Sequence, residues 1–200
     1  MLYAKRDEFT DVTKKIGKIF KLFGLSPNQW TALSVISGLI GFLLLMNQKF
    51  YLSFLSFTLA SLLDLVDGAV AREMKMQTKT GAYFDTISDR IVEFFLILGL
   101  LLQEYPKILV PAKLWIFILL FGSLMTTYSK SAAYEKKLMN KELKGGLLER
   151  GERMILLLLI ILTTPFNRFY AAAMISITSI LSITTFIQRT LKALKMSKVD

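Results

Sequence analysis

The chain has 200 residues, of which 54% are apolar, with a mean hydropathy of +0.50 and a formal net charge of +10. Because soluble domains are about 45–50% apolar, we expect one membrane domain that covers residues 1–200. The chain contains no Cys and no His, which excludes disulfides, thiolate chemistry, histidine general bases and the common zinc ligands. Any chemistry must therefore use carboxylates, Lys, Arg or Tyr.

Residues 1–24 are charged throughout and lack the apolar core of a signal peptide. Between about 7 and 22, apolar residues such as Ile16, Ile19 and Phe20 recur at helical spacing, and four lysines fall largely off that stripe. Amphipathic segments of this kind lie in the membrane interface next to anionic lipid. We expect residues 1–24 to form an interfacial helix, with an ordinary surface helix as the alternative.

Residues 25–190 predict six transmembrane helices. A span needs about 20 mostly apolar residues to cross a hydrocarbon core of about 30 Å. The candidate segments are approximately 28–46, 50–72, 82–102, 112–135, 147–164 and 167–188. The expected fold class is all-α, a membrane bundle of six helices preceded by the interfacial helix.

The basic residues predict how this bundle is oriented. Under the six-span prediction, 21 of the 25 Lys and Arg residues fall on one side of the membrane. The positive-inside rule makes that side cytoplasmic, together with both termini of this multi-pass cell-membrane protein. Basic flanks next to anionic headgroups account for the net charge, so we expect no nucleic-acid partner. No internal repeat supports an inverted-repeat transporter.

Four aspartates lie within 26 residues, near the end of the second predicted span and the start of the third. Asp64 and Asp67 share one face of the first helix. Asp85 and Asp89 share one face of the second helix, and the short linker between the helices makes them antiparallel neighbours. Carboxylate oxygens are the usual ligands of hard divalent cations. The sequence therefore predicts a metal centre at the cytoplasmic end of the bundle.

Helix dipoles provide an alternative for two of these aspartates. Asp85 and Asp89 lie near a helix start, where the dipole alone would stabilise an anion. Asp64 and Asp67 lie near the carboxyl end of their helix, where the dipole is unfavourable, so this alternative does not explain them.

Residues next to the aspartates could form a pocket for a ligand. Small residues leave room for a phosphorylated ligand, and an arginine can pair with its phosphate. The residues in question are Gly68, Ala71, Gly81 and Arg72.

The complete spacing resembles the signature of the CDP-alcohol phosphatidyltransferase family at every fixed position, Asp64-x2-Asp67-Gly68-x2-Ala71-Arg72-x8-Gly81-x3-Asp85-x3-Asp89. The resemblance extends over essentially the whole chain. It implies an enzyme that joins a CDP-activated lipid to a small alcohol and releases CMP. It also implies a homodimer and one or two Mg²⁺ or Mn²⁺ ions held by the aspartates.

The same resemblance implies roles for individual residues. The metal ligands would be Asp64, Asp67 and Asp85. Asp89 would share the metal site and act as general base, because the chain has no histidine. The nucleotide pocket would consist of Gly68, Ala71, Arg72 and Gly81. Asn28 and Thr31 resemble further family positions near the nucleotide, although the preceding Ser26 and Pro27 are also a good helix start.

Basic residues outside the signature predict the acceptor. Lys130, Arg150 and Arg189 lie at cytoplasmic ends of predicted spans, where they could bind a phosphate on the acceptor. The positive-inside rule alone would also place cations there. The triple, together with the ER-x-ER run that begins at Glu149, resembles the branch of the family that uses inositol phosphate. We therefore expect myo-inositol 1-phosphate as acceptor and CDP-diacylglycerol or CDP-archaeol as donor.

Other acceptors and other functions remain as alternatives. Glycerol 3-phosphate would need a similar basic pocket, CDP-inositol could be the donor, and serine would not need three cations. A divalent-cation channel or transporter would place carboxylates near mid-membrane along a pore. Here the carboxylates cluster at one end, which favours the enzyme.

Overall fold

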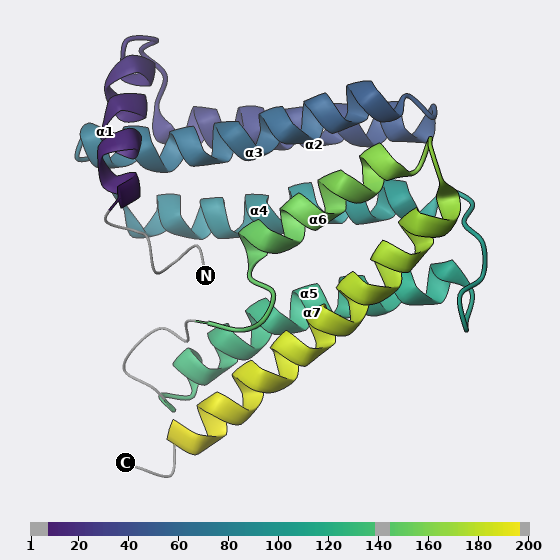
Figure 1. Cartoon of the computed structure of the whole chain (residues 1–200). Coiled ribbons are helices and arrows are strands. Elements are labelled where there is room, and N and C mark those ends of the chain that lie inside the picture. The colour runs from purple at the N-terminus through teal and green to yellow at the C-terminus, as the bar shows by residue number, and fades with distance from the viewer. Residues whose placement is uncertain (1–7, 139–144, 197–200) are drawn as a thin grey trace. The chain divides into compact units, whose positions relative to one another are not determined.

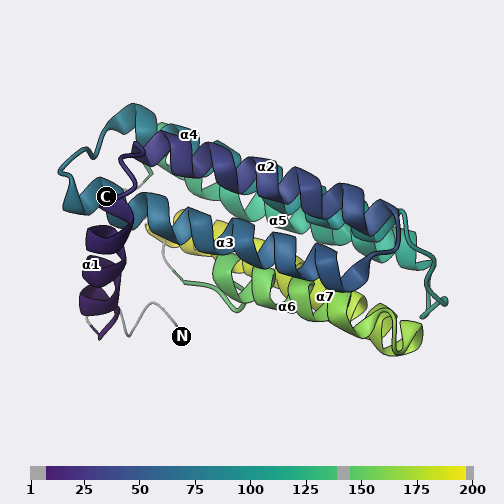
Figure 2. The ribbon, with the colours of Figure 1, turned by 90° about the horizontal axis from the view of Figure 1, so that it is seen from above.

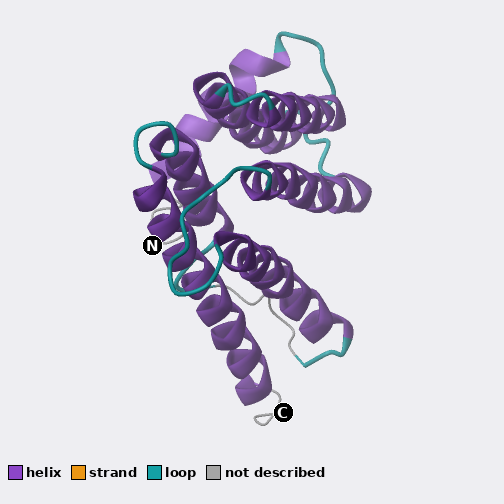
Figure 3. Ribbon diagram, turned by 90° about the vertical axis from the view of Figure 1, so that its right-hand side faces the viewer, coloured by secondary structure: helices purple, strands orange, loops and turns teal. Residues whose placement is uncertain are grey.

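The computed structural model describes residues 8–138 and 145–196. All the elements in this part of the chain are helices, as Figure 3 shows, so the all-α prediction is confirmed. They are α1 (Glu8–Lys21), α2 (Pro27–Met46), α3 (Phe50–Glu73), α4 (Lys79–Leu101), α5 (Ala112–Glu135), α6 (Arg150–Thr163) and α7 (Arg168–Met196). Each of the seven predicted segments corresponds to one helix. Residues 1–7 of the predicted interfacial segment lie outside the described residues.

The chain divides into two compact units, Met1–Leu96 and Ile97–Asp200, which are described separately below. In the first unit, α2 and α3 form an antiparallel hairpin through the turn at Gln48. Small residues let the two helices approach closely. At Gly41, for example, the ring of Phe57 occupies the space that a side chain would need. Serine hydroxyls bond across it, for example Ser53 to the Gly41 carbonyl at 2.8 Å. Such small-residue contacts are typical of helix pairs in membranes.

Helix α1 packs crosswise over one end of this hairpin, next to the carboxyl end of α3 (Figures 1 and 2). The described side chains confirm an amphipathic helix. Ile16 and Phe20 pack against the hairpin, and Lys14, Lys15 and Lys18 are exposed.

In the second unit, α7 packs against both α5 and α6. Gly122 of α5 lies directly on the backbone of α7, where an added Cβ would be 3.1 Å from the Ile183 nitrogen. The loop before α5 contacts the carboxyl end of α6. There the Tyr105 hydroxyl lies 3.2 Å from that of Thr164, and burial raises the pKa of Tyr105 to about 12.

In the described part of the chain, four helices, α2, α3, α5 and α7, are long and apolar enough to cross a membrane. Apolar side chains cover the outer faces of the α2–α3 hairpin. Exposed examples are Ile36, Ile40, Leu43, Leu55, Leu59 and Leu62. The protein is therefore a membrane protein. Helix α4 carries several charged residues, and α6 has 14 residues, about 21 Å of helix.

Candidate active site

The carboxylates of Asp64, Asp67 and Asp85 converge in the first unit. One oxygen from each lies within 4.8 Å of one from each of the others. Asp64 and Asp67 come from the last three turns of α3, and Asp85 comes from the second turn of α4. The short connection between these helices brings the acidic faces together, as the helical spacing predicts. Three like charges this close repel one another strongly, and three oxygen donors fit a hard divalent cation.

Asp67 is the most buried of the three, with 5% of its surface exposed. The hydroxyl of Thr31 on α2 donates a hydrogen bond of 2.5 Å to its carboxylate. Thr31 is itself buried at 3% exposure. A bond of this kind from a buried donor fixes the orientation of a ligating carboxylate. The predicted contact of Thr31 with a nucleotide stays a prediction, and its observed partner is Asp67.

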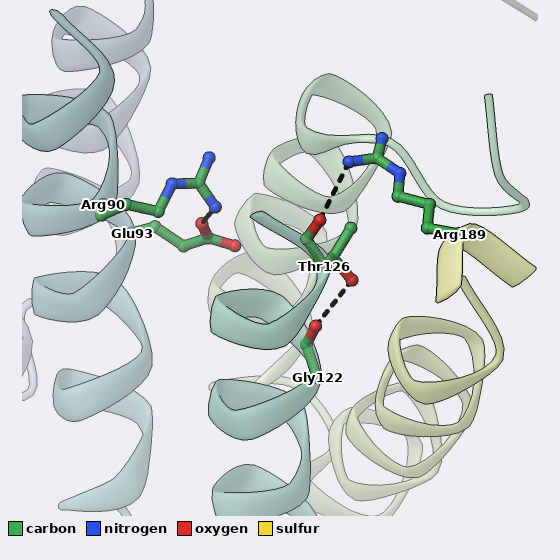
Figure 4. Close-up of polar contacts among 5 residues, drawn as sticks. All are labelled: Arg90, Glu93, Gly122, Thr126 and Arg189. Atoms are coloured by element: carbon green, nitrogen blue, oxygen red, sulfur yellow. Dashed lines mark hydrogen bonds and ion pairs between the residues drawn. The ribbon is translucent and has the colours of Figure 1, made fainter. Parts of the chain in front are cut away.

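Asp89 lies one helical turn beyond Asp85 on α4 and is half-buried. Its carboxylate is not part of the three-carboxylate cluster. One turn further along α4, the buried Glu93 pairs with Arg90 in an ion pair of 2.5 Å (Figure 4). The predicted roles of Asp89, a share in the metal site and general base, stay predictions.

The residues predicted to bind the nucleotide surround the same end of the first unit. A Cβ built on Gly81 would lie 3.4 Å from the Asn28 side-chain oxygen, so α2 and α4 meet here. On α3, the guanidinium of Arg72 folds back over Gly68, whose Cβ would lie 3.4 Å from an Arg72 nitrogen. Ala71 is half-buried on the same helix. The structure thus brings Asn28 to Gly81 and Arg72 to Gly68, beside the aspartates.

In the second unit, Arg189 of α7 bridges two elements. Its Nε donates to the carbonyl of Gly145 at 3.1 Å, and its Nη1 donates to the carbonyl of Thr126 on α5 at 3.2 Å (Figure 4). Lys130 follows Thr126 by one turn of α5. These two bonds use two of the five guanidinium N–H groups, so others are left for an anion.

The loop before α6 is held against α7. The amides of Leu147 and Leu148 donate to the side chains of Gln188 and Thr185 at 3.1 and 2.9 Å. Glu149 then caps α6 through a reciprocal capping box with Glu152. Arg150 is consequently the first residue of α6, at a helix N-terminus, which favours anions.

Three structural features of these sites were missed from the sequence. Thr78 accepts a bond of 2.9 Å from the Gly81 amide, the pattern of a helix N-cap. Gly146 has a φ of +140°, and Gly17 of α1 touches the backbone of α3. The Thr-x-x-Gly pattern before α4 and the Gly145-Gly146 pair were visible signals for the first two features, whereas Gly17 gave none.

Comparison with known proteins gives this arrangement a class. Residues 24–187 match the CDP-alcohol phosphatidyltransferase family. An archaetidylinositol phosphate synthase of Pyrococcus horikoshii is 32% identical, over 98% of this chain and 97% of that protein. The chain belongs to the CDP-alcohol phosphatidyltransferase family and is an enzyme of that type.

Solved structures agree with this assignment. The phosphatidylinositol phosphate synthase of Mycobacterium tuberculosis with CDP-DAG bound is 26% identical and has a TM-score of 0.78, covering 92% of this chain and 94% of that one. The same synthase in complex with manganese and citrate is 27% identical, with a TM-score of 0.79 over 91% of this chain and 88% of that one. The predicted family is confirmed.

Proposed function

We propose that this enzyme transfers a phosphatidyl-type group from CDP-diacylglycerol or CDP-archaeol to myo-inositol 1-phosphate and releases CMP. The observation that carries the proposal is the convergence of Asp64, Asp67 and Asp85 within 4.8 Å, in a chain of this family. The names of the relatives, which are synthases of inositol phosphate lipids, support the acceptor.

In this proposal Asp64, Asp67 and Asp85 hold Mg²⁺ or Mn²⁺, as one or two ions, and Asp89 shares this metal site. The cluster supplies the hard oxygen donors that both ions prefer. When bound, the metal neutralises charge on the pyrophosphate as CMP leaves. Thr31 keeps the Asp67 carboxylate oriented through its 2.5 Å bond.

The cytidine diphosphate group binds beside this cluster, at Gly68, Ala71, Arg72 and Gly81 and near Asn28 and Thr31. The exposed guanidinium of Arg72 supplies charge-assisted bonds to a phosphate. The glycines at 68 and 81 keep the backbone open to the ligand.

Asp89 takes the proton from the acceptor hydroxyl as that oxygen attacks the lipid phosphorus. A phosphorus–oxygen bond to inositol forms, and the phosphoanhydride bond to CMP breaks. The position of Asp89 outside the three-carboxylate cluster supports this assignment, because a carboxylate that is not fully engaged by cations is a better base.

Arg150, Arg189 and Lys130 bind the phosphate of the acceptor. We expect Arg150→Ala to raise the KM for inositol 1-phosphate by about 10- to 100-fold, since a charge-assisted bond contributes about 1.5–3 kcal/mol. The KM for the CDP-lipid should hardly change. Steady-state kinetics with each substrate varied in turn measures both values, and an effect confined to the CDP-lipid would assign Arg150 to the other pocket.

Removal of metal tests the metal centre directly. EDTA should stop CMP release by the purified enzyme, and excess Mg²⁺ or Mn²⁺ should restore it, whereas Ca²⁺-saturated EDTA serves as control for the chelator itself. Full activity in EDTA would contradict the proposed metal dependence.

The membrane arrangement completes the proposal. All six helices from α2 to α7 span the bilayer, α1 lies in the interface, and the active site and both termini face the cytoplasm. We propose a single domain over residues 1–200, which the match of one family over residues 24–187 supports. We also propose a homodimer, to be measured by light scattering with correction for detergent.

A further inference from the structure

Helix α1 packs against α2 and α3, the hairpin that carries Thr31, Asp64 and Asp67 of the candidate site. Ile16 and Phe20 of α1 join a buried cluster with Trp30 of α2 and with Val66 and Val70 of α3. The ring of Phe20 meets that of Trp30 edge-on, with centroids 5.3 Å apart. This cluster is the contact through which α1 is attached to the hairpin.

Each buried hairpin residue of this cluster is the chain neighbour of a residue in the candidate site. Trp30 directly precedes Thr31, which orients Asp67. Val66 directly precedes Asp67, and Val70 is followed by Ala71 and Arg72. Successive residues of a helix point in directions about 100° apart. One residue of each pair therefore packs in the cluster with α1, and its neighbour belongs to the candidate site.

Gly17 is the point of closest approach. A Cβ on Gly17 would lie 2.7 Å from the carbonyl oxygen of Ala69 and 3.0 Å from Cβ of Glu73. Real side chains do not make a contact of 2.7 Å, and the Ala69 oxygen belongs to the backbone and cannot rotate away. Ala69 stands between Asp67 and Arg72 on α3. Any side chain at position 17 therefore displaces α1, α3 or both.

We propose that Gly17 is a positioning residue, through which α1 sets the position of the α3 turn that carries Asp67 and Arg72. The inference rests on the proposed function, because it assigns these two residues to the metal centre and the donor pocket. Helical glycine is less favourable than alanine by about 1 kcal/mol, so Gly17→Ala should strengthen α1 as an isolated helix. Any loss in the variant must come from its packing on α3.

The test compares full-length Gly17→Ala with Gly41→Ala. The control, Gly41→Ala, also adds a methyl group to a close helix contact of the first unit, 2.9 Å from the Phe57 ring. Phe57, however, lies two helical turns before Asp64, the first aspartate of α3. Electron paramagnetic resonance measures the dissociation constant for Mn²⁺, kinetics measures both KM values, and thermal unfolding measures stability. For Gly17→Ala we expect the Mn²⁺ constant and the KM for the CDP-lipid to rise about tenfold or more, with an unchanged acceptor KM.

Gly41→Ala should lower the unfolding temperature and leave Mn²⁺ affinity at the wild-type value. Wild-type Mn²⁺ affinity in folded Gly17→Ala would overturn the inference, as would an equal loss in both variants, because that would indicate general packing damage. The proposed function fails by a different result, which is absence of CMP release by the wild-type enzyme. The Mn²⁺ measurement needs no turnover, so the two failures are distinguishable.

Discussion

We expect the Asp89→Asn variant to keep its Mn²⁺ affinity much better than Asp67→Asn does and to release CMP about 10²- to 10⁴-fold more slowly, the usual contribution of a general base. Asparagine keeps the shape of the side chain but cannot accept the proton. Much of the metal affinity should survive because Asp64, Asp67 and Asp85, whose oxygens lie within 4.8 Å of one another, remain in place. Titration of Mn²⁺ followed by electron paramagnetic resonance, together with a CMP assay, measures both effects.

Asp67→Asn is the matched control for this variant. Asp67 belongs to the cluster, is buried, and accepts the bond from Thr31. We expect its substitution to weaken Mn²⁺ binding and to abolish turnover together. If Asp89→Asn and Asp67→Asn lost the same amount of metal affinity, Asp89 would be a ligand of equal standing and would lose its assignment as base.

The second large effect is expected from Gly146→Ala. At a φ of +140°, residue 146 is in a conformation that side chains rarely adopt, and an added Cβ would lie 2.5 Å from Cγ2 of Thr185. The loop would have to leave α7 and would lose the bond from Arg189 to Gly145. Because misplacement of a binding group by about 1 Å costs about 10²-fold, the KM for inositol 1-phosphate should rise by that order.

Gly151→Ala provides the control for Gly146→Ala. Gly151 is exposed in the first turn of α6, and a Cβ there meets nothing within 4 Å. Kinetics with the acceptor varied should therefore give wild-type values for Gly151→Ala. If Gly146→Ala also kept a wild-type KM for the acceptor, the loop would not shape the acceptor pocket.

The aspartate site was predictable to the extent that helical periodicity determines it. Spacings of three and four residues place Asp64, Asp67 and Asp85 on facing sides of two adjacent helices, and the structure confirms that they meet. Asp89 follows Asp85 by one turn on the same helix, and its predicted share in the metal site stays a prediction.

Helix ends were less predictable because caps and turns decide them. With Thr78 as its cap, α4 begins at Lys79, three residues before its predicted start. With Glu149 as its cap, α6 begins at Arg150, three residues after its predicted start. Helix α7 continues to Met196, beyond the apolar segment that ends near 188, because residues such as Leu191, Lys192 and Lys195 are good helix formers. The contact of Gly17 with Ala69 joins distant parts of the sequence, and no local pattern predicts it.

The most direct test of the proposed function is CMP release by the purified enzyme with Mg²⁺, a CDP-lipid and a single acceptor. Separate reactions would contain inositol 1-phosphate, glycerol 3-phosphate, serine or inositol. We predict CMP release with inositol 1-phosphate alone. The basic residues at 130, 150 and 189 favour a phosphate-bearing acceptor, and the similarity to synthases of inositol phosphate lipids favours inositol over glycerol. Release with glycerol 3-phosphate and none with inositol 1-phosphate would contradict the acceptor, and no release with any of them from folded protein would contradict the CDP-lipid as donor.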